Sequence, residues 1–148
     1  LRADDLDILE YARDLVLASK TPLDEVRREQ ERDLEEKAEF LQASALKQLE
    51  ARQKRAMSAA SMELLRQMCS IARAWLRDVG VCCAGDDSFV VNVDVAASIH
   101  DAAARTTLER VTRAQECVGA CEDAISYNVS PQVSIESMLF EIREVLYA

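Results

Sequence analysis

The residues best able to bind a metal or carry out redox chemistry are five cysteines and a single histidine, His100. No two cysteines form a CxxC pair, and the spacing matches no recognisable set of zinc ligands, so no metal site is predicted. Cys117 and Cys121 would share a helix face that alanines extend, and we expect them to behave as small buried hydrophobic residues. Adjacent Cys82 and Cys83 are predicted to lie in a loop. An odd number of cysteines without a disulfide pattern is typical of a reducing compartment.

Acidic residues suggest a second kind of site, for a hard cation. Asp86, Asp87 and Asp94 lack the spacing of an EF-hand, and turn or capping roles are the better interpretation. There is no glycine-rich phosphate loop, and one histidine does not allow a Ser-His-Asp arrangement. We therefore expect no catalytic residue, no bound cofactor and no enzymatic activity in this chain.

Composition describes the scaffold that would hold these residues. The chain has 148 residues, of which 49% are hydrophobic and 30% charged, with three glycines and two prolines. Such a composition predicts one folded domain made of helices rather than a sheet. The net charge of −9 argues against generic binding to a phosphate backbone. No apolar run approaches membrane-spanning length, and the start at Leu1 without an initiator methionine suggests a piece of a longer protein.

Apolar residues at helical spacing predict a first helix from Asp4 to Ser19, after which Thr21 could cap and Pro22 could begin the next helix. Residues 21–56 carry both charge signs and a narrow apolar stripe. They are predicted to form a solvated helical hairpin or arm, with a turn near Gln42–Ser44 and Ser44 as a possible cap. Too few intact heptads are present to favour a coiled coil.

The strongest periodicity runs from Met57 to Val79 and predicts a helix that Gly80, Gly85 and the following aspartates would end. Residues 89–93 could form a short extended piece. Three further helices are then expected, with capping or starting residues that are, in order, Asp94, Thr106 or Thr107, and Ser130 with Pro131. The fold class is therefore predicted to be an all-α bundle of about five to seven helices without a significant sheet, in a single domain spanning residues 1–148.

Three stretches, in this order, give the chain a resemblance to a known family: Ala45–Arg55 leading to Trp75–Val79, Val91–Asp94 opening a helix, and Ala124–Ile142. The last is similar to a family pattern of an Asn-rich turn followed by a Leu-Glu-x-Leu-Leu helix. Together they resemble the C-terminal region of bacterial DNA polymerase III delta-prime subunits, which belong to the clamp loader. The cysteine-rich loop Val81–Ser88 differs from the family's usual Leu-rich stretch.

This resemblance implies a clamp-loader collar domain, without the ATPase-like and lid domains of the parent protein. Such a domain packs against the equivalent domains of the gamma/tau and delta subunits while the whole complex places the sliding clamp on primed DNA. The family's Ser-Arg-Cys motif has no counterpart here, so no ATP-binding residue is carried over. The implied location is the bacterial cytoplasm.

Large apolar and neighbouring charged side chains on the two best helices are the candidate subunit contacts: Trp75, Met138, Phe140, Glu141 and Arg143. The basic stretch Lys47–Arg55 could touch DNA, but it lacks interleaved aromatic residues and a solvated helix face is favoured. Two alternatives remain open. One is a stand-alone helical or coiled-coil adaptor that binds partners through Leu23–Arg55, and the other is a regulatory metal or redox domain that uses Cys82, Cys83, Cys117 and Cys121.

Overall fold

Helices make up nearly all of the computed structural model, which describes residues 5–127 and 129–147. Within these residues there are six α-helices, three short 3-10 helices and no strand, so the all-α prediction is confirmed. The α-helices are α1 (Asp5–Lys20), α2 (Asp24–Ala38), α3 (Ala43–Cys83), α4 (Ala96–Ala103), α5 (Leu108–Ser126) and α6 (Pro131–Tyr147). The 3-10 helices are η1 (Thr21–Leu23), η2 (Asp87–Phe89) and η3 (Val93–Val95).

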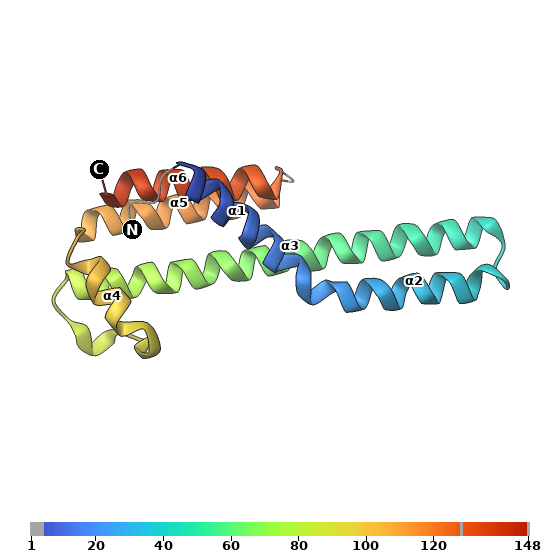
Figure 1. The fold of residues 1–148 in the computed structure, drawn as a ribbon, viewed down its shortest axis with the longest axis horizontal. Helices are drawn as coiled ribbons and strands as arrows, with labels where there is room; N and C mark the ends of the chain where they lie inside the picture. The colour runs from blue at the N-terminus through green and yellow to red at the C-terminus, as the bar shows by residue number, and fades with distance from the viewer. Residues whose placement is uncertain (1–4, 128, 148) are drawn as a thin grey trace.

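Helix α3 is the longest element and runs the length of the molecule (Figure 1). It joins the second helix of the predicted arm and the helix predicted from Met57 to Val79 into one. It passes straight through Gly80, the first of the residues expected to end it, and stops just before Gly85, which was also expected to end it. Gly80 lies where α5 comes close, because a Cβ there would sit 3.4 Å from side-chain carbons of both Leu108 and Val111. This glycine therefore serves helix packing, and the true stop is Gly85, whose φ of 81° is accessible to glycine without strain.

Several predicted caps are wrong. Thr21 lies in η1, and its hydroxyl donates 3.2 Å back to the carbonyl of Leu17 rather than capping α2. The hairpin turn falls at residues 39–42, so Ser44 is already inside α3 and the extended Gln42 precedes it without a side-chain cap. Asp94 lies inside η3, and residues 89–93 form 3-10 turns and coil rather than an extended strand.

Two predicted helix starts are confirmed. The Thr107 hydroxyl accepts a 3.4 Å hydrogen bond from the backbone N–H of Arg110 and caps α5. Pro131 is the first residue of α6, where its missing N–H would have no intrahelical partner in any case. The carbonyl of Ser130 accepts the backbone N–H of Ser134 at 3.0 Å in the first turn of that helix.

The core lies where the second half of α3 packs against α1, α4 and α5, and α6 completes it by packing on α5 and α1 (Figure 1). Helix α5 runs antiparallel to α3, since Arg73 pairs with Glu122 at 3.0 Å and Arg66 reaches Ser126 at 3.3 Å one to two turns away. The interior is filled by aliphatic side chains that are at most 1% exposed, among them Leu65, Ile99, Val111, Val118, Ile125 and Ile135. Removing this apolar surface from water supplies most of the folding free energy.

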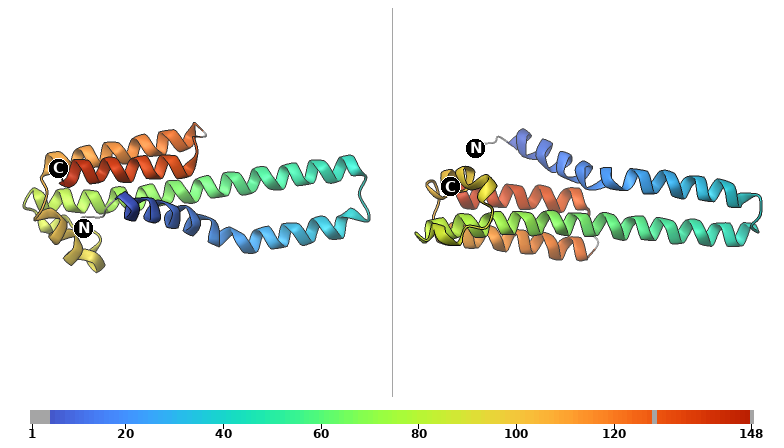
Figure 2. Two further views of the ribbon diagram at one scale, coloured as in Figure 1. Left: turned by 45° about the horizontal axis from the view of Figure 1, so that its top comes forward. Right: turned by 90° about the horizontal axis from the view of Figure 1, so that it is seen from below.

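The first half of α3 leaves the bundle and pairs with α2 to form an arm (Figure 2). Helix α2 has no buried residue, which fits its mixed charges and narrow apolar stripe. Polar contacts in the arm include Lys37 with Asp33 at 2.6 Å and Gln53 donating to Asp33 at 3.4 Å. The arm is therefore a two-helix layer with little interior of its own.

We expect the arm to open locally far more often than the bundle, because few buried apolar contacts oppose its separation. In native-state hydrogen exchange followed by mass spectrometry, amides of α2 should exchange at least about 100-fold faster than those of α5, whose inner face is buried. Equal protection of the two helices would contradict this expectation.

Candidate functional site

An apolar groove of about 510 Å³ lies between α1, α3 and α6. Side chains at helical spacing along α3 form one wall, and α6 and α1 supply the rest; its lining includes Leu15, Met68, Ile71, Trp75, Leu139 and Ile142. Ile71 is 70% exposed, unusually open for an isoleucine beside a core. The groove thus presents hydrophobic surface that a neighbouring helix could cover.

The predicted subunit contacts have different positions relative to this groove. Trp75 lines it and is half-buried. Met138 also borders it but is only 5% exposed, so most of its side chain belongs to the core. Glu141 is exposed and accepts a 3.0 Å hydrogen bond from Ser137 on its own helix.

Phe140 and Arg143 take part in a contact within the chain. The Arg143 guanidinium lies 5.3 Å from the centre of the Phe140 ring and pairs with Asp5 of α1 at 2.7 Å. The pair with Asp5 joins the end of α6 to the start of α1, whereas the contact with Phe140 lies within α6, and each is worth up to about 1 kcal/mol. The structure therefore gives both residues a role that does not require a partner subunit.

A second candidate site lies where α3 ends. Gly85 donates to the carbonyl of Cys82 at 3.0 Å, and Asp86 donates to the carbonyl of Val81 at 3.3 Å. This is the Schellman pattern, which satisfies the last carbonyls of a helix and turns the chain sharply. Cys82 and Cys83 are therefore the last two residues of α3, not loop residues as predicted.

Asp78 holds the later part of the connection between α3 and α4, and its side chain is fully buried. One carboxylate oxygen accepts the backbone N–H groups of Val91 at 3.1 Å and Asn92 at 2.8 Å, and the Asn92 side-chain amide at 2.7 Å. The other oxygen pairs with Arg77 at 2.9 Å. Burial alone would raise the pKa of Asp78, but the hydrogen bonds from Asn92 and Val91, together with Arg77, outweigh it and hold the pKa below its ordinary value.

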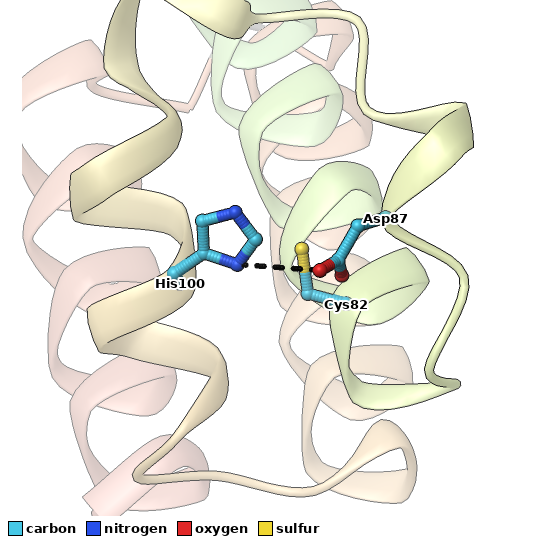
Figure 3. A group of neighbouring side chains, drawn as sticks. All are labelled: Cys82, Asp87 and His100. Atoms are coloured by element: carbon cyan, nitrogen blue, oxygen red, sulfur yellow. Dashed lines mark ion pairs between the residues drawn. The ribbon is translucent and has the colours of Figure 1, made fainter.

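Three different elements bring Cys82, Asp87 and His100 together (Figure 3). Cys82 comes from the end of α3, Asp87 begins η2, and His100 points toward both from α4. The His100 Nδ1 atom lies 4.0 Å from a carboxylate oxygen of Asp87. Burial, with the adjacent Asp87 carboxylate, raises the pKa of the half-buried Cys82 thiol. These side chains border a polar hollow of about 530 Å³.

Of the remaining cysteines, Cys83 borders the same polar hollow, whereas Cys69, Cys117 and Cys121 do not. Cys121 is buried, as predicted, against Cys69 of α3. Its thiol donates a hydrogen bond to the sulfur of Cys69, and this bond, together with burial, raises the pKa of Cys121. Cys117 is only half-buried, and its thiol donates to the carbonyl of Arg113 at 3.2 Å. Cys83 donates to the carbonyl of Ala103 at 3.7 Å.

A site built from Cys82, Cys83, Cys117 and Cys121 is therefore contradicted for the part of the chain that the structure describes. Because α5 runs antiparallel to α3, its cysteines lie about two to four turns away from the end of α3 that carries Cys82. Within residues 5–127 and 129–147, three possible metal ligands converge only at Cys82, Asp87 and His100.

Sequence reasoning missed both Asp78 and this cluster. Asp78 lies two residues after buried Leu76 and directly before buried Val79, and an aspartate on such a face signals a buried acceptor. Cys82, Asp87 and His100 have the spacing C-x4-D-x12-H, which emerges only when cysteine, aspartate and histidine are considered together.

No family model matches the chain, and the comparisons with curated proteins and with solved structures find no match either. Among the described residues, none of the helices combines the length and the apolar character needed to cross a bilayer.

Proposed function

We propose that this chain is a non-catalytic oligomerisation domain of the clamp-loader collar type. The observation that carries the proposal is the apolar groove between α1, α3 and α6, with Ile71 standing 70% exposed at its edge. A helix of a neighbouring subunit can fill such a groove by packing its side-chain ridges between those of α3 and α6. Each large aliphatic side chain buried in this way contributes about 1.5–3 kcal/mol before the costs of association.

The sequence resemblance supplies the identity of the neighbours. In the delta-prime family they are the collar domains of the gamma/tau and delta subunits, and the sliding clamp and primed DNA are reached only through the whole complex. In this role the chain would act in the bacterial cytoplasm and would not itself catalyse a reaction. Direct contact with DNA is not part of the proposal, because the basic stretch Lys47–Arg55 lies in an arm whose other helix is rich in acidic residues.

The proposal predicts that Ile71→Asp abolishes or strongly weakens binding to a purified gamma/tau collar domain. A carboxylate in the groove would have to be desolvated on association, so the dissociation constant should rise at least about tenfold, or 1.4 kcal/mol. Calorimetry at several concentrations measures this constant. Since Ile71 is exposed in the free chain, the variant should fold normally, which circular dichroism checks.

A matched control distinguishes the collar from the adaptor alternative. Phe40 lies in the turn at the tip of the arm and is 85% exposed. If the chain were an adaptor that binds partners through the arm, Phe40 would be its strongest candidate contact. Phe40→Asp should leave collar binding unchanged if the groove is the contact. Association of the wild-type chain that is lost in Phe40→Asp and kept in Ile71→Asp would assign binding to the arm. The absence of association up to high micromolar concentration would overturn the collar proposal.

A further inference from the structure

We propose that Cys82, Asp87 and His100 form a binding site for one Zn²⁺ ion, with solvent as the remaining ligand. The site is independent of the collar proposal, because it lies at the end of α3 away from the apolar groove and uses none of the groove residues. Bound Zn²⁺ would tie the α3–α4 connection to both helices and so stabilise this end of the bundle.

The geometry is close to what zinc requires. The sulfur of Cys82, a carboxylate oxygen of Asp87 and an imidazole nitrogen of His100 all lie within 4.8 Å of one another. Zinc–ligand bonds of about 2.0–2.3 Å in a tetrahedron place ligand atoms about 3.3–3.8 Å apart. The 4.0 Å between His100 and Asp87 is already near this range. Modest side-chain rotations complete the approach, and Figure 3 shows all three side chains directed toward a common point.

Each ligand is positioned by a separate feature of the fold. The Schellman turn at Gly85 directs the chain back along α3, so that Asp87 lies beside Cys82. The hydrogen bonds to Asp78 fix Val91 and Asn92, which hold the connection against the helix. Ile99, fully buried, docks α4 and so places the adjacent His100 over the pair. Three ligands supported independently in this way form a preorganised site.

The donor types select zinc among common cations. Thiolate sulfur and imidazole nitrogen are ligands that Zn²⁺ prefers, and a carboxylate often completes the set. Ca²⁺ and Mg²⁺ prefer sets made of oxygen atoms, which this site does not provide. A thiolate and a carboxylate also carry two negative charges, which balance the charge of the ion. Three protein ligands leave one coordination position for water from the adjoining polar hollow.

The test uses the whole chain, purified without added metal and titrated with Zn²⁺ or with Co²⁺ as a spectroscopic substitute. We expect one ion per chain, a thiolate-to-cobalt charge-transfer band that Zn²⁺ abolishes, and a Tm that rises with zinc concentration. Ca²⁺ and Mg²⁺ should produce none of these changes. Cys82→Ser and His100→Gln should each weaken binding at least about 100-fold, since even the loss of an outer-shell partner costs 10–100-fold.

Two neighbouring residues provide controls with the same chemistry. Cys83→Ser removes the adjacent thiol and Asp86→Asn the adjacent carboxylate, and neither should reduce affinity more than about threefold, because neither is a ligand in the proposed set. Failure of the wild-type chain to bind Zn²⁺ would overturn the proposal, as would full affinity in Cys82→Ser or His100→Gln. The three residues would then be a surface ion pair beside a half-buried thiol.

Discussion

Replacement of Asp78 with alanine is expected to destabilise the protein by about 2–4 kcal/mol. The buried carboxylate accepts three hydrogen bonds from Val91 and Asn92, and its removal leaves these donors without their partner. Each unpaired buried donor costs about 1–3 kcal/mol, although water can reach some of them once the loop relaxes. Urea unfolding followed by circular dichroism measures the loss as a lower midpoint at an unchanged slope.

Asp123→Ala is the matched control, since this aspartate is exposed on α5 and should change stability by less than about 0.5 kcal/mol. Asp78→Asn keeps the shape and one acceptor but loses the charge, so its cost should fall between the two. Equal stability of Asp78→Ala and the control would show that the loop does not depend on this carboxylate.

The lowered pKa of Asp78 also determines how its contribution varies with pH. A carboxylate with a depressed folded-state pKa stabilises the fold fully above its ordinary value of 3.8, and the stabilisation is lost as pH falls through the lower folded-state value. Acid unfolding of the wild-type chain should therefore be steeper than that of Asp78→Asn in this range.

Replacement of Ile99 with alanine is expected to cost about 2–5 kcal/mol. Ile99 is 0% exposed and, among the residues that the structure describes, is the only fully buried one in α4. Truncation therefore removes the main apolar contact by which α4 packs on α3. Chemical denaturation measures the global loss. Hydrogen exchange should show that amides of α4 lose protection more than those of α5, because a short helix that loses its one fully buried side chain separates locally.

Val93→Ala removes similar apolar atoms six residues earlier, at a position 74% exposed. It should change stability by less than about 0.5 kcal/mol, because these atoms contact water in the folded state. A loss in Ile99→Ala no greater than in this control would contradict the anchoring role.

Helix positions were largely predictable because apolar periodicity reflects the face that each helix buries. The length of α3 was not, since its first half buries almost nothing and leaves only a weak periodic signal. Gly80 misled the prediction for a related reason: a glycine that ends a helix and one that allows another helix to approach look alike in sequence. Caps such as Asp94 failed because 3-10 turns displaced the start of α4.

Part of the apolar groove could be predicted from the sequence, but the cluster of Cys82, Asp87 and His100 could not. Trp75 could be found on the groove because it continues the apolar stripe of its helix. The convergence of Cys82, Asp87 and His100 depends on a left-handed Gly85 and on hydrogen bonds between Asp78 and residues thirteen and fourteen positions later. Contacts of that kind are set by tertiary structure and have no local periodic signal.

A single rod joins the bundle to the tip of the arm. Helix α3 has 41 residues and, at a rise of 1.5 Å per residue, extends about 60 Å. No proline or coil interrupts α3, so this helix gives the arm no hinge. The direction of the arm is therefore set by how the core packs around the C-terminal half of α3. A small tilt of the packed half of α3 therefore displaces the turn around Phe40 much farther than it displaces the residues of α3 in the core.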